Sequence, residues 1–192
     1  MGVAGAPAAG RLDPVEVTAL ADLVVDVPDF PQPGVTFKDI TPLLASPDGL
    51  ATAVRGLAVL APEGIDAVVA LEARGFLFGA PVALALGVGL VPVRKPNKLP
   101  REHVDVTYDL EYGTETLAMH VDALAPGQRV LVVDDVLATG GTVAATAGLV
   151  RRLGAEVAAV AVVLELDFLH GRRRLHEAGL DDVRALVSTG GA

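Results

Sequence analysis

The sequence predicts an α/β fold in which helices flank a mostly parallel central sheet. Three continuous apolar runs of strand length, at residues 65–71, 129–134 and 156–166, alternate with segments of helical pattern. Strands that are apolar throughout are typical of parallel sheets, because both faces of such strands are buried. A chain of 192 residues is long enough for one domain with a substantial core.

Proline and capping residues define the elements expected before the first buried strand. An Asp-Pro pair and a Ser-Pro-Asp run are both typical of helix N-termini, where Asp or Ser accepts from free amides and proline fits the first turn. The proline-rich segment between the two helices is expected in a loop or an edge strand, because proline removes a ladder donor. The expected elements are a loose tail over residues 1–12, a helix from Asp13-Pro14 to about Val25, the loop or edge strand at 28–40, and a helix from Ser46-Pro47-Asp48 to about Leu60.

Beyond the first buried strand, helical and strand patterns alternate up to residue 166. Residues 75–93 carry no charge and are long enough to cross a bilayer, but their glycines, prolines and strand-like end favour a buried helix followed by a buried strand. Residues 104–121 alternate polar and apolar positions around Gly113, which predicts a protruding hairpin. The expected elements are a helix to about Leu86, a strand at 90–93, the hairpin, and a helix from about Gly141 to Leu153 that Gly154 ends.

The composition excludes several classes of function. The net charge is −9, whereas nonspecific binding of nucleic acid needs a basic surface. The chain has no cysteine, which excludes disulfides, a thiolate nucleophile and a cysteine-based zinc site. Its first ten residues lack the basic and long apolar regions of a secretory signal. We therefore expect a cytoplasmic protein that binds neither nucleic acid nor a membrane.

The segment RVLVVDDVLATGGTV, residues 129–143, predicts a phosphate-binding turn after a buried strand. Ligands of open parallel sheets bind beyond the carboxyl ends of the strands, where Asp134 and Asp135 are expected. Small residues then lead into a helix N-terminus, whose amides and dipole favour an anion. The absence of a lysine after the glycines excludes a Walker loop. An ordinary helix-capping turn would explain one aspartate but not two beside a T-G-G-T run, whereas two carboxylates suit the hydroxyls of a sugar phosphate.

Basic residues follow two of the predicted strands. Arg74 comes after the strand at 65–71, and Arg94, Lys95 and Lys98 come after the next strand. The carboxyl ends of parallel strands meet at one edge of a sheet, so these cations are expected near the predicted phosphate turn. A basic cluster is ordinarily a solvated face. Its convergence from two strand ends in an acidic protein favours an anion site instead.

Four segments of the chain resemble the type I phosphoribosyltransferases. VLVVDDVLATGGT resembles the family's motif for 5-phosphoribosyl 1-pyrophosphate (PRPP), and DFPQPGVTFKDITPLL, LEARGFLFGAPVALALG and VRKPNKLP…YDLEYGTETL resemble its adenine-specific members. The match covers about residues 28–175. The resemblance implies an enzyme of purine salvage that converts adenine and PRPP, with Mg²⁺, to AMP and pyrophosphate, and that acts as a homodimer.

The resemblance also implies a role for each candidate binding residue. The 5′-phosphate is expected to bind Ala138, Thr139, Gly140, Gly141 and Thr142, and the ribose hydroxyls to bind Asp134 and Asp135. The pyrophosphate is expected to bind Arg74, Lys95, Lys98 and Tyr112, with Lys98 arriving from the partner subunit. The adenine ring is expected between Phe37 and Leu166, with backbone groups near Thr36 and Lys38 at its edge. As apolar residues, Phe37 and Leu166 could equally belong to the core.

Glu111, in the segment LEYG, is the residue expected to assist the chemistry. In the family this glutamate lies on a mobile loop that closes over the site, where a carboxyl group could manage the proton as N9 of adenine becomes the bonding atom. Without the resemblance it would be read as a surface glutamate. Mg²⁺ is expected to bind through pyrophosphate and ribose oxygens, with no direct protein ligand and with a water-mediated contact to Asp134 as an option.

One domain is expected over residues 1–192, with 28–40 and 160–192 contributing to a hood over the base and 96–121 forming the flexible loop. Two alternatives stay open. A phosphoribosyltransferase for a 6-oxopurine such as xanthine or hypoxanthine would tend to place a lysine against the base, but the segment ELDFLHG is acidic. A non-catalytic PRPP-sensing regulator would need a DNA-binding module, for which residues 1–27 are too short and too acidic. The run 172–174, three arginines, is expected as an exposed helix face.

Overall fold

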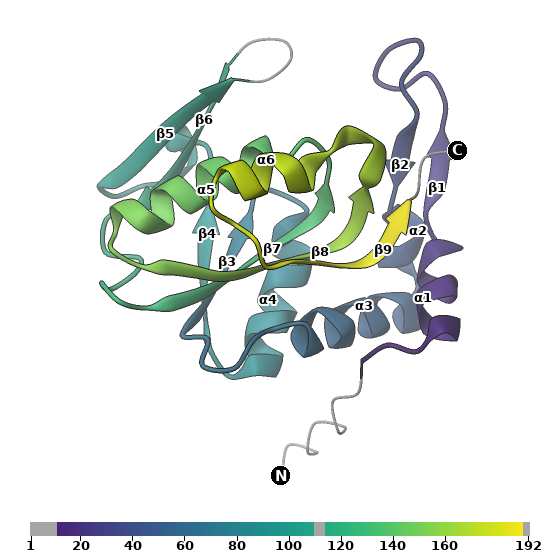
Figure 1. The fold of residues 1–192 in the computed structure, drawn as a ribbon, viewed down its shortest axis with the longest axis horizontal. Helices are drawn as coiled ribbons and strands as arrows, with labels where there is room; N and C mark the ends of the chain where they lie inside the picture. The colour runs from purple at the N-terminus through teal and green to yellow at the C-terminus, as the bar shows by residue number, and fades with distance from the viewer. Residues whose placement is uncertain (1–10, 110–113, 190–192) are drawn as a thin grey trace.

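A five-stranded parallel sheet with the strand order β4-β3-β7-β8-β9 forms the centre of the protein (Figure 1). The structure is a computed structural model that describes residues 11–109 and 114–189. The strands of this sheet are β3 (Ala67–Leu71), β4 (Gly89–Val93), β7 (Arg129–Leu137), β8 (Glu156–Leu166) and β9 (Val183–Thr189). The predicted α/β class with a parallel sheet is confirmed.

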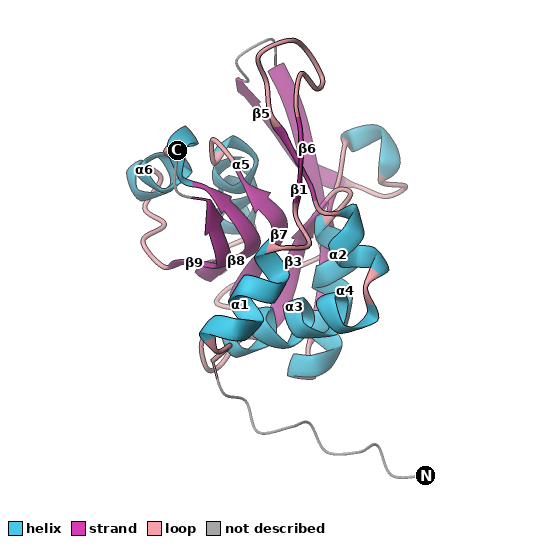
Figure 2. Cartoon of the chain, turned by 90° about the vertical axis from the view of Figure 1, so that its right-hand side faces the viewer, coloured by secondary structure: helices cyan, strands magenta, loops and turns pink. Residues whose placement is uncertain are grey.

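Helices cover both faces of the sheet (Figure 2). One face carries α1 (Pro14–Ala21), α2 (Thr41–Ala45), α3 (Pro47–Val59) and α4 (Gly75–Leu86). The other face carries α5 (Gly141–Arg152), α6 (Gly171–Glu177) and the hairpin of β5 (His103–Asp109) and β6 (Thr114–His120). Two single turns, η1 (Pro96–Lys98) and η2 (Asp167–Leu169), and a small antiparallel pair, β1 (Val25–Val27) with β2 (Phe37–Asp39), complete the described elements.

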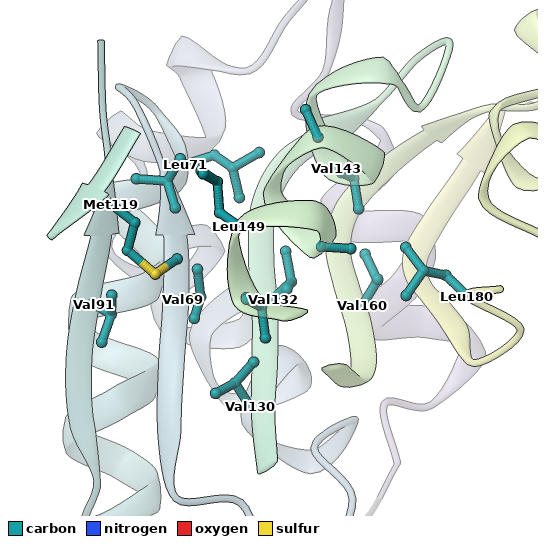
Figure 3. Close-up of a cluster of buried hydrophobic side chains, with 14 of the residues drawn as sticks. Val69, Leu71, Val91, Met119, Val130, Val132, Val143, Leu149, Val160 and Leu180 are labelled. Carbon is teal, nitrogen blue, oxygen red and sulfur yellow. The ribbon is translucent and has the colours of Figure 1, made fainter. Parts of the chain in front are cut away.

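Each apolar strand contributes to two cores because successive side chains of a strand point to opposite faces. In β7, Val130 and Val132 pack under α5 with Val69 and Met119 (Figure 3). The alternate residues, such as Leu131, pack under α3 and α4. This double burial explains why these strands read as continuous apolar runs.

The charge-free segment 75–93 forms the predicted helix and strand, α4 and β4. None of the helices that the structure describes combines the length and apolar character needed to cross a membrane. The hairpin expected at 104–121 is also confirmed, since β5 and β6 pair antiparallel from His103↔His120 to Asp109↔Thr114.

Four boundaries or elements differ from the prediction. The first helix ends at Ala21, not near Val25, because the following valines pair with β2 instead. Strand β7 runs to Leu137 rather than 134, because its pairing with β8 continues that far. The short helix α2 and the last strand β9 were not predicted, since neither has a strong local signal. Arg172 is exposed, as expected for the run at 172–174, and it also pairs with buried Glu165, which the sequence did not predict.

Helix α4 lies so close to β3 that one position accepts no side chain. A Cβ atom on Gly79 would lie 2.5 Å from the Cβ of Ala70, whereas one on Gly148 of α5 would meet nothing within 4 Å.

We expect Gly79→Ala to lower the free energy of unfolding by about 1–3 kcal/mol through overpacking. Gly148→Ala should leave it unchanged or raise it by up to about 1 kcal/mol, because alanine favours a helix. Urea denaturation of the two variants checks this, and equal stabilities would contradict the close approach.

Candidate active site

The turn between β7 and α5 forms a cradle for an anion. Gly140 is the N-cap of α5 and has a left-handed φ of 79°, which glycine adopts without strain. Because the N-cap has no side chain, none accepts from the first amides of α5. A Cβ atom on the next glycine, Gly141, would lie 3.0 Å from the Arg174 guanidinium and 3.4 Å from the Tyr108 ring. The turn therefore presents uncapped amides at a helix N-terminus, as anion binding requires.

The two aspartates lie inside the last part of β7, not at its end as expected. Since β7 continues to Leu137, Asp134 and Asp135 point to opposite faces of the strand. Asp135 is 5% exposed, and its Oδ2 lies 2.8 Å from Arg74 Nε. The N–H of Arg74 is not aligned with that oxygen, so the contact is an ion pair without a directed hydrogen bond. The structure thus pairs Asp135, which is expected to bind the ribose, with Arg74, which is expected to bind the pyrophosphate.

The environment of Asp134 favours the protonated carboxyl group. Burial, followed by the neighbouring Asp135 carboxylate, raises the pKa of Asp134 well above its ordinary value, although part of the side chain still reaches solvent. Its Oδ1 accepts a hydrogen bond of 2.9 Å from the Asp135 amide. The start of α4 approaches closely, since a Cβ on Gly75 would lie 2.8 Å from the same oxygen. A perturbed carboxyl at a strand end is typical of functional sites.

Basic side chains lie after the neighbouring ends of β3 and β4, and two of them pair with an acid. Arg94 donates to both carboxylate oxygens of Glu72 at 3.1 and 3.2 Å, and this bond lowers the pKa of Glu72. Lys95 Nζ lies 2.8 Å from Glu115 Oε1, and this bond raises the pKa of Lys95. Lys98 is exposed on η1. The predicted cation cluster is therefore present, but acidic partners that the sequence analysis had not identified hold two of its members.

A polar chain joins this cluster to the anion cradle. The Tyr108 hydroxyl donates to Glu115 Oε2 at 3.0 Å and lies 3.1 Å from Thr142 Oγ1. Since the hydroxyl donates its one proton to Glu115, Thr142 must donate to Tyr108. Tyr108 and Glu115 were missed from the sequence. They face each other in the hairpin register, so an antiparallel pairing around Gly113 could have identified them.

The predicted adenine residues lie on two separate elements. Phe37 lies on β2, with its ring 5.5 Å from the Arg74 guanidinium carbon and 5.2 Å from the edge-on ring of Phe30. Leu166 ends β8 and is 9% exposed within the core of the α1–α4 face. Thr36 immediately precedes β2, and the Lys38 side chain pairs with Asp26 of β1 at 2.6 Å. The structure thus brings Phe37 to the cation cluster, while Leu166 also serves as a core residue.

Two further predicted residues, Glu111 and Tyr112, lie outside the described residues. The strands on either side of them, β5 and β6, are described, and Tyr108 of β5 packs against the start of α5 through its contact with the Gly141 position.

Comparisons with known proteins agree with this geometry. A family model for the phosphoribosyl transferase domain matches residues 38–185. An adenine phosphoribosyltransferase of Cutibacterium acnes is 56% identical over 169 residues, which cover 88% of this chain and 96% of that relative. One of Thermobifida fusca is 55% identical over 175 residues, which cover 90% of this chain and 98% of that relative.

Solved structures of such enzymes share the fold. The adenine phosphoribosyltransferase of Thermoanaerobacter pseudethanolicus has a TM-score of 0.86 and 46% identity, covering 90% of this chain and 99% of its own. That of Saccharomyces cerevisiae, in complex with adenine and an imino-altritol bisphosphate, has a TM-score of 0.83 and 40% identity, covering 90% and 98%. With the anion cradle, the paired acids and the cation cluster at one sheet edge, these matches lead to one conclusion: the chain belongs to the phosphoribosyltransferase family, among the adenine phosphoribosyltransferases.

Proposed function

We propose that the chain transfers the 5-phosphoribosyl group of PRPP to adenine, which gives AMP and pyrophosphate. The observation that carries the proposal is the meeting of three parts at one sheet edge: the cradle at 138–142, the acids Asp134 and Asp135, and the cations around Arg74. These parts correspond to the phosphate, the ribose and the pyrophosphate of PRPP. The relatives' printed names supply the base, adenine.

The 5′-phosphate binds the amides of the cradle, and the ribose hydroxyls donate to the two aspartates. Oδ2 of Asp135 has no aligned donor among the described residues, so it can accept from a hydroxyl while it stays paired with Arg74. The raised pKa of Asp134 makes its ionisation responsive to ligands, because a sugar hydroxyl or a nearby cation favours the charged carboxylate. Both groups thus hold the anomeric carbon of the ribose toward the base.

The cations neutralise the departing pyrophosphate. As the bond from the anomeric carbon to the pyrophosphate oxygen breaks, its electron pair leaves with the oxygen, and Arg74, Lys95 and Lys98 stabilise the added charge. Lys95 pairs with Glu115. This pair is partly exposed, and such pairs are weak, so the more highly charged pyrophosphate can replace the carboxylate. Tyr112 provides a further contact to pyrophosphate.

Adenine enters beside Phe37, where N9 attacks the anomeric carbon and a new C–N bond forms. The aromatic ring offers one face for stacking, the Arg74 guanidinium lies over that ring, and Leu166 offers the opposite apolar face. Backbone groups near Thr36 and Lys38 read the base edge. The proton that N9 loses passes to Glu111, the general base on the hairpin.

Mg²⁺ accompanies PRPP in this proposal. Asp134 and Asp135 offer carboxylate oxygens, which suit a hard cation, but two carboxylates cannot complete its octahedral shell. The ion would therefore be held by pyrophosphate and ribose oxygens and water, with no direct protein ligand, and Asp134 would contact it through water. When bound, the ion would offset negative charge on the leaving group. We also propose a cytoplasmic location, which a cysteine-free chain suits.

The choice of base is tested by supplying PRPP and Mg²⁺ with adenine, hypoxanthine, guanine or xanthine in turn, and by following nucleotide formation. We expect turnover with adenine alone, because the proposed pocket offers an apolar face and backbone groups rather than a lysine donor for a 6-oxo group. Turnover of xanthine or hypoxanthine but not of adenine would overturn the proposed substrate. Binding of PRPP without turnover of any base would favour a sensor, and a gel-shift with DNA would then follow.

Glu111 is tested by Glu111→Ala. General acid–base catalysis contributes at least about 100-fold, so kcat is expected to fall by about that factor while the KM values for PRPP and adenine change little. Thr107→Val is the matched control on the same hairpin, because Thr107 contacts Thr116 on the strand face away from Tyr108. Undiminished kcat in Glu111→Ala would remove that residue from the mechanism.

A homodimer is proposed through the outer face of α4 and the edge strand β4. Leu77, Leu84 and Leu90 are exposed there, and Leu84 is 83% exposed. This surface adjoins η1, which carries Lys98, so a partner bound to it would lie close to the cation cluster.

Sedimentation should show that Leu84→Glu shifts the protein from dimer to monomer. Val15→Glu, at an equally exposed apolar position on α1, should leave the dimer intact. A monomeric parent protein would contradict the proposal.

A further inference from the structure

The ion pair between Arg172 and Glu165 ties the start of α6 to the sheet. Arg172 Nε donates to Glu165 Oε1, and Nη2 donates to Oε2, each at 2.6 Å. The remaining Nη1 donates to the carbonyl oxygen of Val183 at 2.6 Å. One guanidinium therefore joins α6 to both β8 and β9. This arrangement uses the planar fork of arginine, which a lysine ammonium cannot reproduce.

Glu165 is a costly residue to bury, since it is 4% exposed at the end of β8. It lies opposite Leu137 of β7 and Ser188 of β9, in the middle of the sheet edge where the site is built. Only the acid of this pair is buried, since the Arg172 side chain is 49% exposed, and partly exposed ion pairs contribute little to stability. A directed pair differs from an apolar contact in fixing one orientation of α6 on the sheet.

The start of α6 lies directly against the anion cradle. A Cβ atom on Gly140 would lie 2.9 Å from the carbonyl oxygen of Gly171, the first residue of α6. A Cβ atom on Gly171 would in turn collide with the carbonyl oxygen of Ala138. The buried side chain of Leu175 lies 3.3 Å from the same Gly140 position. Because this packing is backbone against backbone, a displacement of α6 must displace the turn.

We propose that Arg172 and Glu165 are positioning residues for the 5′-phosphate: their ion pair holds α6 against residues 138–142 and so keeps the cradle amides aimed at the phosphate. The inference rests on the proposed function, because it takes this turn as the phosphate site. Neither side chain contacts the substrate. Arg172 and Arg173 are both exposed, but Arg172 pairs with a buried acid of the sheet, whereas Arg173 contacts only the exposed Glu177 of its own helix.

The test compares two ligands in the full-length protein. Ribose 5-phosphate probes the cradle, and pyrophosphate with Mg²⁺ probes the cations at β3 and β4, on the other side of the site. Arg172→Lys keeps the charge but loses the fork. We expect the Kd for ribose 5-phosphate to rise about tenfold, since small misplacements of binding groups have effects of this order or larger. The Kd for pyrophosphate should not change, and KM for PRPP should rise with little change in kcat.

Two further variants complete the experiment. Arg173→Lys changes a solvent-exposed arginine of the same helix and should alter neither Kd. Gly171→Ala leaves the ion pair in place but pushes on the turn, and it should weaken ribose 5-phosphate selectively, as Arg172→Lys does. A lower melting temperature for Arg172→Lys with both Kd values unchanged would show a merely structural pair and overturn the inference. Equal weakening of both ligands would overturn it as well. Failure of the parent protein to bind ribose 5-phosphate would instead refute the proposed function.

Discussion

The pairing of β7 with β8 is the interaction on which the site depends. Their parallel ladder continues from Arg129↔Glu156 out to Leu137↔Glu165, beyond the ends of the neighbouring strands β3 and β4. This extension holds Asp134 and Asp135 in the strand and places the glycine-rich turn immediately after Leu137, which is still a core residue. The same ladder places Glu165, and through it Arg172 and α6, behind the cradle. A phosphate-binding turn needs amides fixed before the ligand arrives, and here the sheet provides that rigidity.

The second constraint on the site is the pairing of its basic side chains with acidic ones. The protein is acidic overall, with a net charge of −9, yet its cations gather at one edge. Each of three basic side chains has an acidic partner: Arg74 has Asp135, Arg94 has Glu72 and Lys95 has Glu115. These carboxylates limit self-repulsion among the cations until an anion binds. A chain of contacts from Lys95 through Glu115 and Tyr108 to Thr142 also joins the proposed pyrophosphate site to the proposed phosphate site.

Much of the site could be predicted because its signals are local. The cradle was recognisable from a T-G-G-T run after a buried strand, and Arg74 and Lys95 from their positions after two other strands. Tyr108 and Glu115 were missed because their importance depends on pairing across the hairpin and on contact with α5. The exposed position expected for Arg172 is confirmed, but its ion pair with a buried acid was not predicted. Its partner Glu165 lies seven residues earlier, and only the turn between β8 and α6 brings the two together.

The sequence by itself determined the α/β class, the apolar strands, the hairpin and the glycine-rich turn that leads into a helix N-terminus. Each follows from side-chain periodicity or from backbone requirements that act over a few residues. Only the tertiary structure decided where β7 ends, that Val25–Val27 leaves the first helix to pair with β2, and which acid holds each cation. Those outcomes depend on contacts between residues far apart in the chain, and the free energy of such contacts exceeds the local preferences that a sequence pattern records.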